Sequence, residues 1–491
     1  MLSVLVCHSY FLHLDQKQLQ RGKPYPALAT LQVAAMLRKT GRRVAFFDAM
    51  IAQGLEEYER TLESVQPQVV LLYEDTFNFL SKMCLGTMRR AACQMIGSAR
   101  RAGARVIAAG PDVSDAPAPY LQAGADVTLV GEGLSALLDL LARLDVHPNA
   151  SAADLACGLS GVNVLRQDKI VTTSGARVLR SADYEGSAAW DLVDMDRYRS
   201  VWMKTHGYFS LNMAASRGCS FRCAWCAKPT WGNLYLQRDP VAVATEMAYL
   251  KRSFDPQHIW FADDIFGFRV DWVKDFAAAA AAAGGAVRFT IQTRADLISV
   301  SMAQALERAG CFEAWIGAES GSQRVLDAMN KGTTVSQILT ARHRFRSAGI
   351  RVGFFIQLGY LGEELADILA TRDLLEAARP DEIGVSVSYP LPGTKFHELV
   401  KAQLGRKTHW QESSDLDMMF HGTYTSNFYR SVRDLLHDEI LLQTDVAGFD
   451  EHETSRNPTA LGARALERRW HELIDSEAQY RSPDGRSAAS G

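Results

Sequence analysis

The sequence has few cysteines and little that marks a secreted or membrane-spanning protein. Eight cysteines occur among 491 residues, and their uneven spacing argues against a secreted disulfide scaffold. No stretch approaches the ~18 uninterrupted apolar residues of a transmembrane helix. The start, MLSVLVCHSYFLH, lacks the basic region of a signal peptide. These absences predict a protein of the reducing cytoplasm that does not act at a membrane.

An excess of charge of one sign is also missing. The chain has 53 lysines and arginines against 56 aspartates and glutamates, a formal net charge of −3. This balance gives no general attraction for nucleic acid or anionic lipid. The length exceeds the roughly 250–300 residues at which a single hydrophobic core stops growing, which predicts more than one domain.

Residues 1–145 alternate short apolar runs with helical patterns. Five of the runs are rich in β-branched residues, as buried parallel strands are. These runs are residues 2–7, 43–48, 68–73, 105–110 and 126–131. The alternation predicts an open α/β sheet of the flavodoxin or Rossmann type, with ligands at the carboxyl ends of the strands.

Three further regions follow. Residues 146–208 contain a small β-ribbon and a polar segment, and we expect them to link two domains. Residues 209–396 contain six strand candidates separated by helical patterns, too few for an eight-fold barrel and enough for a partial (β/α)6 barrel. The candidates are 209–216, 258–263, 288–293, 312–317, 351–357 and 383–388. Residues 397–491 are predicted to be mainly helical, with a polar, disordered tail.

Three of the eight cysteines, Cys219, Cys223 and Cys226, stand within eight residues. Thiolates select zinc, copper(I) or iron–sulfur clusters. A structural zinc site needs four ligands, and no convincing fourth is present. A 4Fe–4S cluster held by three cysteines uses all of them and leaves one iron open. The alternative is three incidental core cysteines. The triplet follows the first predicted barrel strand, where β/α barrels build active sites.

The spacing Cys-x3-Cys-x2-Cys, with Trp225 before the last cysteine, resembles the signature of radical S-adenosylmethionine (SAM) enzymes. The resemblance implies that the open iron binds the amino and carboxylate groups of SAM, with Trp225 as part of the cofactor site. It also implies that the reduced cluster cleaves SAM to methionine and a 5′-deoxyadenosyl radical. A reducing partner such as a flavodoxin or ferredoxin would supply the electron.

Further stretches resemble parts of the same family. In WFADDIFGF, Asp263 and Asp264 are candidates to receive the SAM amino group, against a helix cap or a surface pair. Arg294, after the third strand, suits a carboxylate or a ribose, against a surface ion pair. In GAESGSQRVLDAMNKG, the resemblance implies that Glu319 and Lys331 hold the ribose or amino group and the carboxylate of SAM, against a structural salt bridge.

Two stretches late in the chain also bear on the site, the first of them by resemblance to the family. IQLGYLGEE has Leu361 where relatives have the proline of Gly-x-Pro-Gly-Glu, and we expect the turn to be kept. MMFHGTYT, residues 418–425, would suit an apolar substrate, but its methionines and aromatic residues favour a core position.

The first 145 residues resemble the cobalamin-binding domain that precedes the barrel in one subgroup of the family. A corrin face is expected from the loops at 8–24, 74–79, 110–115 and 131–133. The residues that we expect to contact cobalamin are Thr76, Gly110, Gly131, Glu132 and Gly133. The cobalt-ligating motif Asp-x-His-x-x-Gly is absent, as is common in the subgroup. A Rossmann-like domain that lost its cofactor, or that binds a nucleotide, is the alternative.

The leading hypothesis is a cobalamin-dependent radical SAM enzyme that methylates an unactivated carbon of a small biosynthetic substrate. The alternative closest to it is an oxidative cyclase of the anaerobic magnesium-protoporphyrin monomethyl ester type. A non-catalytic corrinoid or iron–sulfur sensor is a third possibility. A tRNA methylthiotransferase would need further cluster cysteines and a basic RNA-binding domain, and neither is visible.

Overall fold

The computed structural model describes residues 2–77, 86–173, 175, 187–226, 234–404, 416–447 and 458–482. The chain divides into two compact units. The first consists of Met1–Ser220, Lys228–Asp264 and Ala282–Arg288, and the second of Phe221–Ala227, Ile265–Ala281 and Phe289–Gly491. The tail at 482–491 was predicted to be disordered. Its first residue, Ser482, is buried and donates from N to the carbonyl oxygen of Thr423, and the rest lies outside the described residues.

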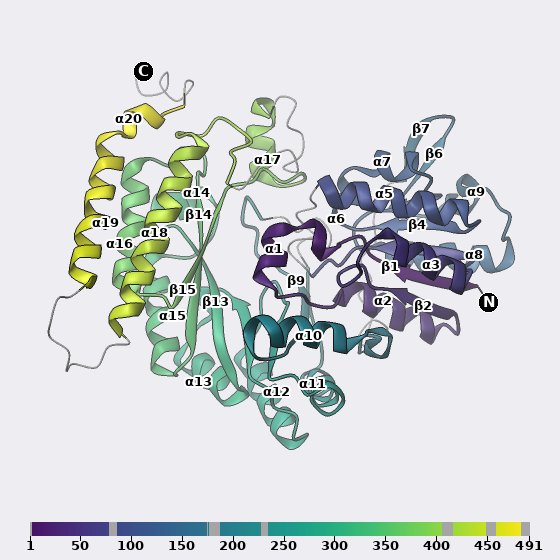
Figure 1. Ribbon diagram of the computed structural model, residues 1–491, viewed down its shortest axis with the longest axis horizontal. Helices are drawn as coiled ribbons and strands as arrows, with labels where there is room; N and C mark the ends of the chain where they lie inside the picture. Colours follow the sequence, from purple (N-terminus) through teal and green to yellow (C-terminus); the bar gives the residue numbers. More distant parts are fainter. Residues whose placement is uncertain are drawn as a thin grey trace. The chain divides into compact units, whose positions relative to one another are not determined.

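The first unit contains a seven-stranded sheet with the order β2-β1-β3-β4-β5-β6-β7 (Figure 1). Its strands are β1 (Ser3–Cys7), β2 (Arg43–Phe47), β3 (Val69–Tyr73), β4 (Arg105–Ala109), β5 (Val127–Leu129), β6 (Val162–Arg166) and β7 (Lys169–Thr172). Strands β1 to β5 pair in parallel, which confirms the five predicted strands and the α/β class.

The ribbon expected in the linker belongs to this sheet. Strand β6 pairs antiparallel with β5, and β7 pairs antiparallel with β6. The buried side chain of Asn163 donates a hydrogen bond to Thr128 Oγ1 over 3.0 Å, and Val162 and Val164 are buried beside it. The β-ribbon therefore extends the edge of the first sheet, which the local sequence did not reveal.

One face of the sheet carries a large apolar cluster. Alternate residues of the parallel strands point to the same side of a sheet. Here they are Leu5 and Cys7 of β1, Val70 and Leu72 of β3, and Val106 and Ala108 of β4. Helices α3 (Leu55–Val65) and α5 (Gly86–Arg101) pack on this face with Tyr58, Met95 and Ile96. Cys7 is thus a small buried apolar residue.

The first unit also contains a short parallel strand pair. Strand β8 (Ser210–Met213) pairs with β11 (His258–Phe261), and α11 (Pro240–Phe254) lies between them in the chain. The polar segment of the predicted linker contains helix α10 (Met195–His206). Its Trp202 is buried and donates a hydrogen bond from Nε1 to the carbonyl oxygen of Pro24 over 2.7 Å. This segment is therefore packed structure.

The second unit contains four parallel strands in the order β15-β14-β13-β12 (Figure 1). They are β12 (Phe289–Thr293), β13 (Cys311–Glu319), β14 (Arg351–Leu358) and β15 (Glu382–Val387). The strands are connected by helices: α13 (Val300–Ala309) lies between β12 and β13, α15 (Val335–Ser347) between β13 and β14, and α16 (Leu365–Ala378) between β14 and β15. Together with β8 and β11, these strands account for all six candidates between 209 and 390.

The C-terminal region is helical, as expected. Helix α18 (Ser426–Ala447) packs against β15 and against α19 (Pro458–Asp475), and Figure 1 shows the two helices side by side in yellow tones. None of the helices in the described part of the chain is long and apolar enough to cross a membrane.

Candidate active site

Residues 221–226 of the cysteine loop belong to the second unit. Hydrogen bonds to two other segments of that unit hold them in place. Ala224 N donates to the carbonyl oxygen of Met329 over 2.8 Å, and the carbonyl oxygen of Ala224 accepts from Phe396 N over 2.9 Å. Asn330 Nδ2 donates to the carbonyl oxygen of Arg222 over 2.8 Å. Because the carbonyl groups and N–H groups of an irregular loop need partners, these bonds give the loop one preferred conformation.

Cys219 belongs to the first unit. It follows β9 (Ser216–Gly218), which pairs antiparallel with β10 (Tyr235–Gln237), and its side chain is buried. Gly218 has φ 73°, a left-handed conformation that favours glycine just before the first cysteine.

Arg294 lies against Cys223 in the second unit. Its Nη1 is 3.7 Å from Cys223 Sγ, and its guanidinium carbon is 3.7 Å from the centre of the Phe221 ring. Nε and Nη2 donate to the two carboxylate oxygens of Asp296 over 2.9 and 3.1 Å. Nη2 also donates to Thr333 Oγ1 over 2.9 Å. Arg294 therefore follows β12, as predicted. The carboxylate that it binds is that of Asp296, a residue of the protein itself.

Glu319 and Lys331 form the ion pair that the sequence allowed. Lys331 Nζ is 2.7 Å from Glu319 Oε1, and both side chains are buried. Glu319 ends β13 with φ 62°, next to a shift in the register between β13 and β14 at Gly317 and Glu319. A non-glycine residue with positive φ is uncommon, and strain of this kind occurs often at functional sites.

A capping box follows Lys331 and fixes where the next helix begins. Thr334 N donates to Gln337 Oε1 over 2.8 Å, and Gln337 N donates to Thr334 Oγ1 over 3.2 Å. The first turn of α15 is thereby defined three residues after the lysine.

Trp225 packs against an apolar cluster of the second unit. The buried members of this cluster are Val325, Met329, Tyr360, Phe396, Val400, Leu404, Met419 and Phe420. Met419 and Phe420 come from the 418–425 segment, which confirms its predicted core position. Nε1 of Trp225 is buried and has no hydrogen-bond partner in the described part of the chain. An unpartnered buried donor is costly, which makes it a candidate contact for a ligand.

Asp263 and Asp264 differ in their surroundings. Asp263 is buried and accepts hydrogen bonds from Ala215 N, over 2.9 Å, and from Ser216 Oγ. Burial raises the pKa of Asp263 to about 7, although these two hydrogen bonds act in the opposite direction. Asp264 is half-buried. The contacts of Asp263 favour its structural interpretation, that of holding the chain after β8.

Two of the predicted cobalamin contacts have buried polar atoms without partners. Thr76 Oγ1 and Glu132 Oε2 make no hydrogen bond with any described residue. The other carboxylate oxygen of Glu132 accepts from Arg217 Nη1, and its carbonyl oxygen accepts from Tyr73 Oη over 2.9 Å. Burial raises the pKa of Glu132 to about 7, with Arg217 acting in the opposite direction. Both unpartnered atoms suit the amides of a ligand.

The three glycines predicted to contact cobalamin all have positive φ angles. Gly131 has φ 67° and Gly133 φ 65°. Gly110 has φ 152°, and a Cβ there would lie 2.7 Å from Cβ of Glu74, so the chain passes too close for a side chain. These positions therefore require glycine for the fold itself, whether or not a ligand binds.

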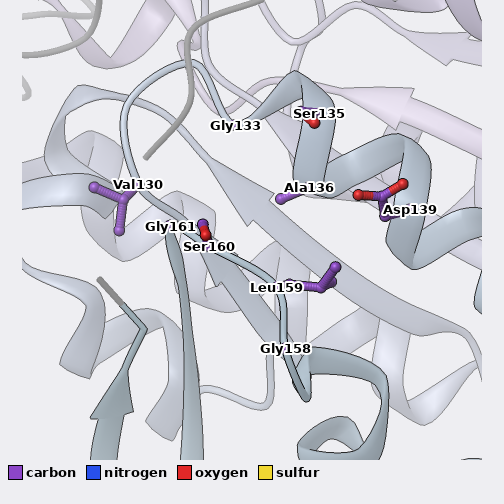
Figure 2. Close-up of a pocket in the computed structure, with 9 residues that line it drawn as sticks. All are labelled: Val130, Gly133, Ser135, Ala136, Asp139, Gly158, Leu159, Ser160 and Gly161. Atoms are coloured by element: carbon purple, nitrogen blue, oxygen red, sulfur yellow. The ribbon is translucent and has the colours of Figure 1, made fainter. Parts of the chain in front are cut away.

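A pocket of about 110 Å³ lies beside the carboxyl end of β5 (Figure 2). It is lined by Val130, Gly133, Ser135, Ala136 and Asp139 and by residues 158–161. Gly133 is the only predicted site residue in its lining. Residues 158–161 precede β6, so the pocket depends on the antiparallel extension of the sheet that the sequence did not predict.

Among the described residues, no three His, Cys, Asp or Glu side chains come together as a set of metal ligands. The assignment of Cys219, Cys223 and Cys226 to a cluster therefore rests on their sequence pattern and stays a prediction.

Comparison with known proteins identifies the central part of the chain. Residues 213–375 match the model of the radical SAM superfamily. These residues form a radical SAM domain. The resemblance drawn from the cysteine spacing is thus confirmed, and the cysteine loop, Arg294, Glu319 and Lys331 all lie within the radical SAM domain.

Relatives of known sequence match only part of the chain. An uncharacterized methyltransferase of Pyrococcus horikoshii is 24% identical over 53% of this chain and 56% of its own length. An anaerobic magnesium-protoporphyrin IX monomethyl ester cyclase of Synechocystis is 25% identical over 55% of this chain and 53% of its own. The matches span about half the length of these curated relatives.

Solved structures share the fold over most of the chain. The cobalamin-dependent radical SAM enzyme OxsB, with aqua-cobalamin bound, matches 96% of this chain and 72% of its own, with a TM-score of 0.68 and 16% identity. The radical SAM methyltransferase TsrM of Kitasatospora setae matches 82% of this chain and 76% of its own, with a TM-score of 0.64 and 17% identity. At these identities the likeness concerns the fold alone.

Sequence reasoning missed several residues of the site. Asp296 was accessible from the sequence, because it stands two residues after Arg294 in TRAD. Phe221 was also accessible as the aromatic residue inside the cysteine loop. Arg217, the partner of Glu132, carried no such signal, since 85 residues separate the two.

Proposed function

We propose that this chain is a cobalamin-dependent radical SAM enzyme that methylates an unactivated carbon of a small molecule. Residues 1–145 would be its cobalamin-binding domain, 146–208 the connection, 209–396 a partial barrel and 397–491 the C-terminal region. The observation that carries the proposal is the cysteine loop: inside the radical SAM domain, its Cys223 lies against the guanidinium of Arg294.

The residues around the loop fit an iron–sulfur cluster. All three cysteines of the motif are without a disulfide. The Arg294 N–H donor beside Cys223 Sγ favours a sulfur atom that carries negative charge. The apolar cluster that Trp225 joins would limit the access of water to one side of the loop.

The bound cofactors would supply a 5′-deoxyadenosyl radical from SAM and a transferable methyl group from cobalamin, and the protein would supply placement and exclusion of water. Lys331 would bind the carboxylate of SAM, and Glu319 its amino group or ribose. In the structure the two side chains already neutralise each other, so each is held in position before a ligand arrives. Trp225 Nε1, for which no described residue is a hydrogen-bond partner, would donate to the same ligand.

In the first unit, the unpartnered Thr76 Oγ1 and Glu132 Oε2 would bond the amides of cobalamin. Asp263, whose oxygens are both engaged, would hold the chain near Cys219 and leave any contact with SAM to Asp264. We further propose a cytoplasmic enzyme that receives electrons from a flavodoxin or ferredoxin and requires neither nucleic acid nor a membrane.

Anaerobic reconstitution of the full chain, followed by counts of iron, sulfide and cobalt, tests the proposal. We expect one 4Fe–4S cluster and one cobalamin per chain, and reductive cleavage of SAM to 5′-deoxyadenosine. The variant C223S should lose the cluster and the cleavage. The control C157S, which changes an exposed cysteine outside the motif, should retain both. A C223S protein that still cleaves SAM would refute the assignment of the loop.

A radical SAM oxidative cyclase is the second candidate, because anaerobic magnesium-protoporphyrin cyclases are among the relatives. Methyl-labelled SAM separates the two reactions. In a methylase the label reaches the substrate-derived product, whereas a cyclase gives an unlabelled ring. A protein that binds the cofactors but does not cleave SAM after reduction would instead be a sensor.

A further inference from the structure

The guanidinium of Arg294 has no edge left for an external carboxylate. A carboxylate is bound most strongly by two parallel N–H groups along one edge of the guanidinium. In Arg294 the edge formed by Nε and Nη2 is occupied by both oxygens of Asp296. Nη2 also donates to the carbonyl oxygen of Lys331, over 2.7 Å, and to Thr333 Oγ1. What remains is Nη1, which lies 3.7 Å from Cys223 Sγ.

The face of the guanidinium is covered as well. Its carbon lies 3.7 Å above the centre of the Phe221 ring, a distance typical of a close cation–π contact. Arg294 as a whole is only 4% exposed. A charged donor that is shielded from water interacts more strongly with its acceptor than an exposed one. Among the described residues, the contact of Nη1 with Cys223 Sγ is therefore the hydrogen bond through which Arg294 can act on a cysteine of the motif.

The partners of Arg294 hold it from two separate segments. Asp296 follows β12 directly in the short turn Ala295–Leu297, while the carbonyl oxygen of Lys331 and Thr333 Oγ1 come from the segment before α15. Lys331 is also the partner of Glu319. The arginine thus fixes the position of Cys223 relative to the Lys331–Glu319 pair.

We propose that Arg294 is a positioning residue of the cluster loop, which raises the reduction potential of the bound cluster through Cys223, and that it is not a ligand of SAM. This inference rests on the proposed function, because it concerns the cluster that the three cysteines would hold. Hydrogen bonds to the ligand sulfurs of an iron–sulfur cluster set its potential, since they stabilise the more negative, reduced form.

The test is a redox titration of the reconstituted full-length protein, followed by the electron paramagnetic resonance signal of the reduced cluster. In R294Q, the ratio of reduced to oxidised cluster at a fixed potential should fall roughly tenfold, a shift of the midpoint by about −59 mV for one electron. F221L keeps the guanidinium and removes the ring beneath it, so its midpoint should shift in the same direction by less. Binding of radiolabelled SAM should stay within about twofold of wild type in R294Q, because the guanidinium edge faces Asp296.

The matched control is R324Q. Arg324 also donates to a carboxylate, that of Asp367, but it lies on α14 (Gln323–Ala328) and its side chain is largely exposed. The midpoint potential of the cluster in R324Q should equal that in the wild-type protein. If R294Q does not retain iron, the midpoint of F221L decides, and an F221L midpoint identical to wild type overturns the proposal.

Two other results would also overturn it: an unchanged midpoint in R294Q, or a tenfold loss of SAM affinity in that variant. A wild-type protein without any cluster signal would refute the proposed function itself, and the inference with it. A wild-type signal with no shift in the variants refutes only the role of Arg294.

Discussion

Glu363 allows a direct test of how a buried carboxyl group makes the stability of this protein depend on pH. It lies in the turn between β14 and α16, where its side chain is 1% exposed. Oε2 accepts a hydrogen bond from Gly359 N over 2.6 Å, while Oε1 has no partner among the described residues. Burial raises its pKa from 4.5 to about 8, and the hydrogen bond from Gly359 only partly opposes this.

Because folding raises the pKa of Glu363, this group makes the protein less stable as the pH rises. The folded protein holds the proton until about pH 8, whereas the unfolded chain releases it above its ordinary pKa of 4.5. The contribution of protonated Glu363 to the free energy of unfolding is therefore fully present below pH 4.5, and it is lost as the pH rises through about 8. Between about pH 5.5 and about pH 8.5, this one group should lower the free energy of unfolding by about 3 kcal/mol.

E363Q replaces the carboxyl group by a neutral group of the same shape, which can still accept from Gly359 N. The variant should therefore gain about 3 kcal/mol relative to wild type between those two pH values. Urea unfolding followed by circular dichroism at both pH values measures the difference. E376Q, which changes an exposed glutamate on α16, should show no such gain. A difference between E363Q and wild type that does not change with pH would refute the reasoning.

Three further variants test the packing of the described residues by urea unfolding. K331M leaves the buried carboxylate of Glu319 unpaired and should cost about 3–5 kcal/mol; a loss below about 1 kcal/mol would show that Glu319 finds another partner. Glu246 Oε2 lies 2.6 Å from Nη1 of the buried Arg238. E246Q removes the charge that balances Arg238 and should cost about 3 kcal/mol, and a neutral effect would contradict that ion pair. In G321A, the new Cβ would stand 2.1 Å from the carbonyl oxygen of Ala370 in α16, so we expect a loss of about 1–3 kcal/mol, and full stability would mean that α16 can move.

The turn after β14 shows a local pattern that survives a substitution. The sequence has Leu361 where relatives have proline, and we expected the turn to be kept. The structure confirms it, because Glu363 N donates to the carbonyl oxygen of Tyr360 over 2.9 Å, and Gly359 and Gly362 both have positive φ. Two glycines with the required φ are sufficient for the turn, so the stiffness of a proline is not needed.

For two charged residues of the site, the sequence did not decide the partner. Arg294 was recognised as a cation after the third strand and Lys331 as one after a helix, and the sequence left open whether a ligand or a protein carboxylate neutralises each of them. Lys331 pairs with Glu319 and Arg294 with Asp296. The first pair spans two chain segments, and the second depends on the conformation of a single turn.

The sequence by itself determined the strands and helices and the spacing of the three cysteines, because apolar periodicity, glycine positions and the reach of one short loop are local properties. The tertiary structure decided which atoms meet: the addition of β6 to the first sheet, the ion pair of Glu132 with Arg217, and the guanidinium of Arg294 beside Cys223. Such contacts join residues that are tens of positions apart, so they form only when whole elements pack and bury the same side chains together.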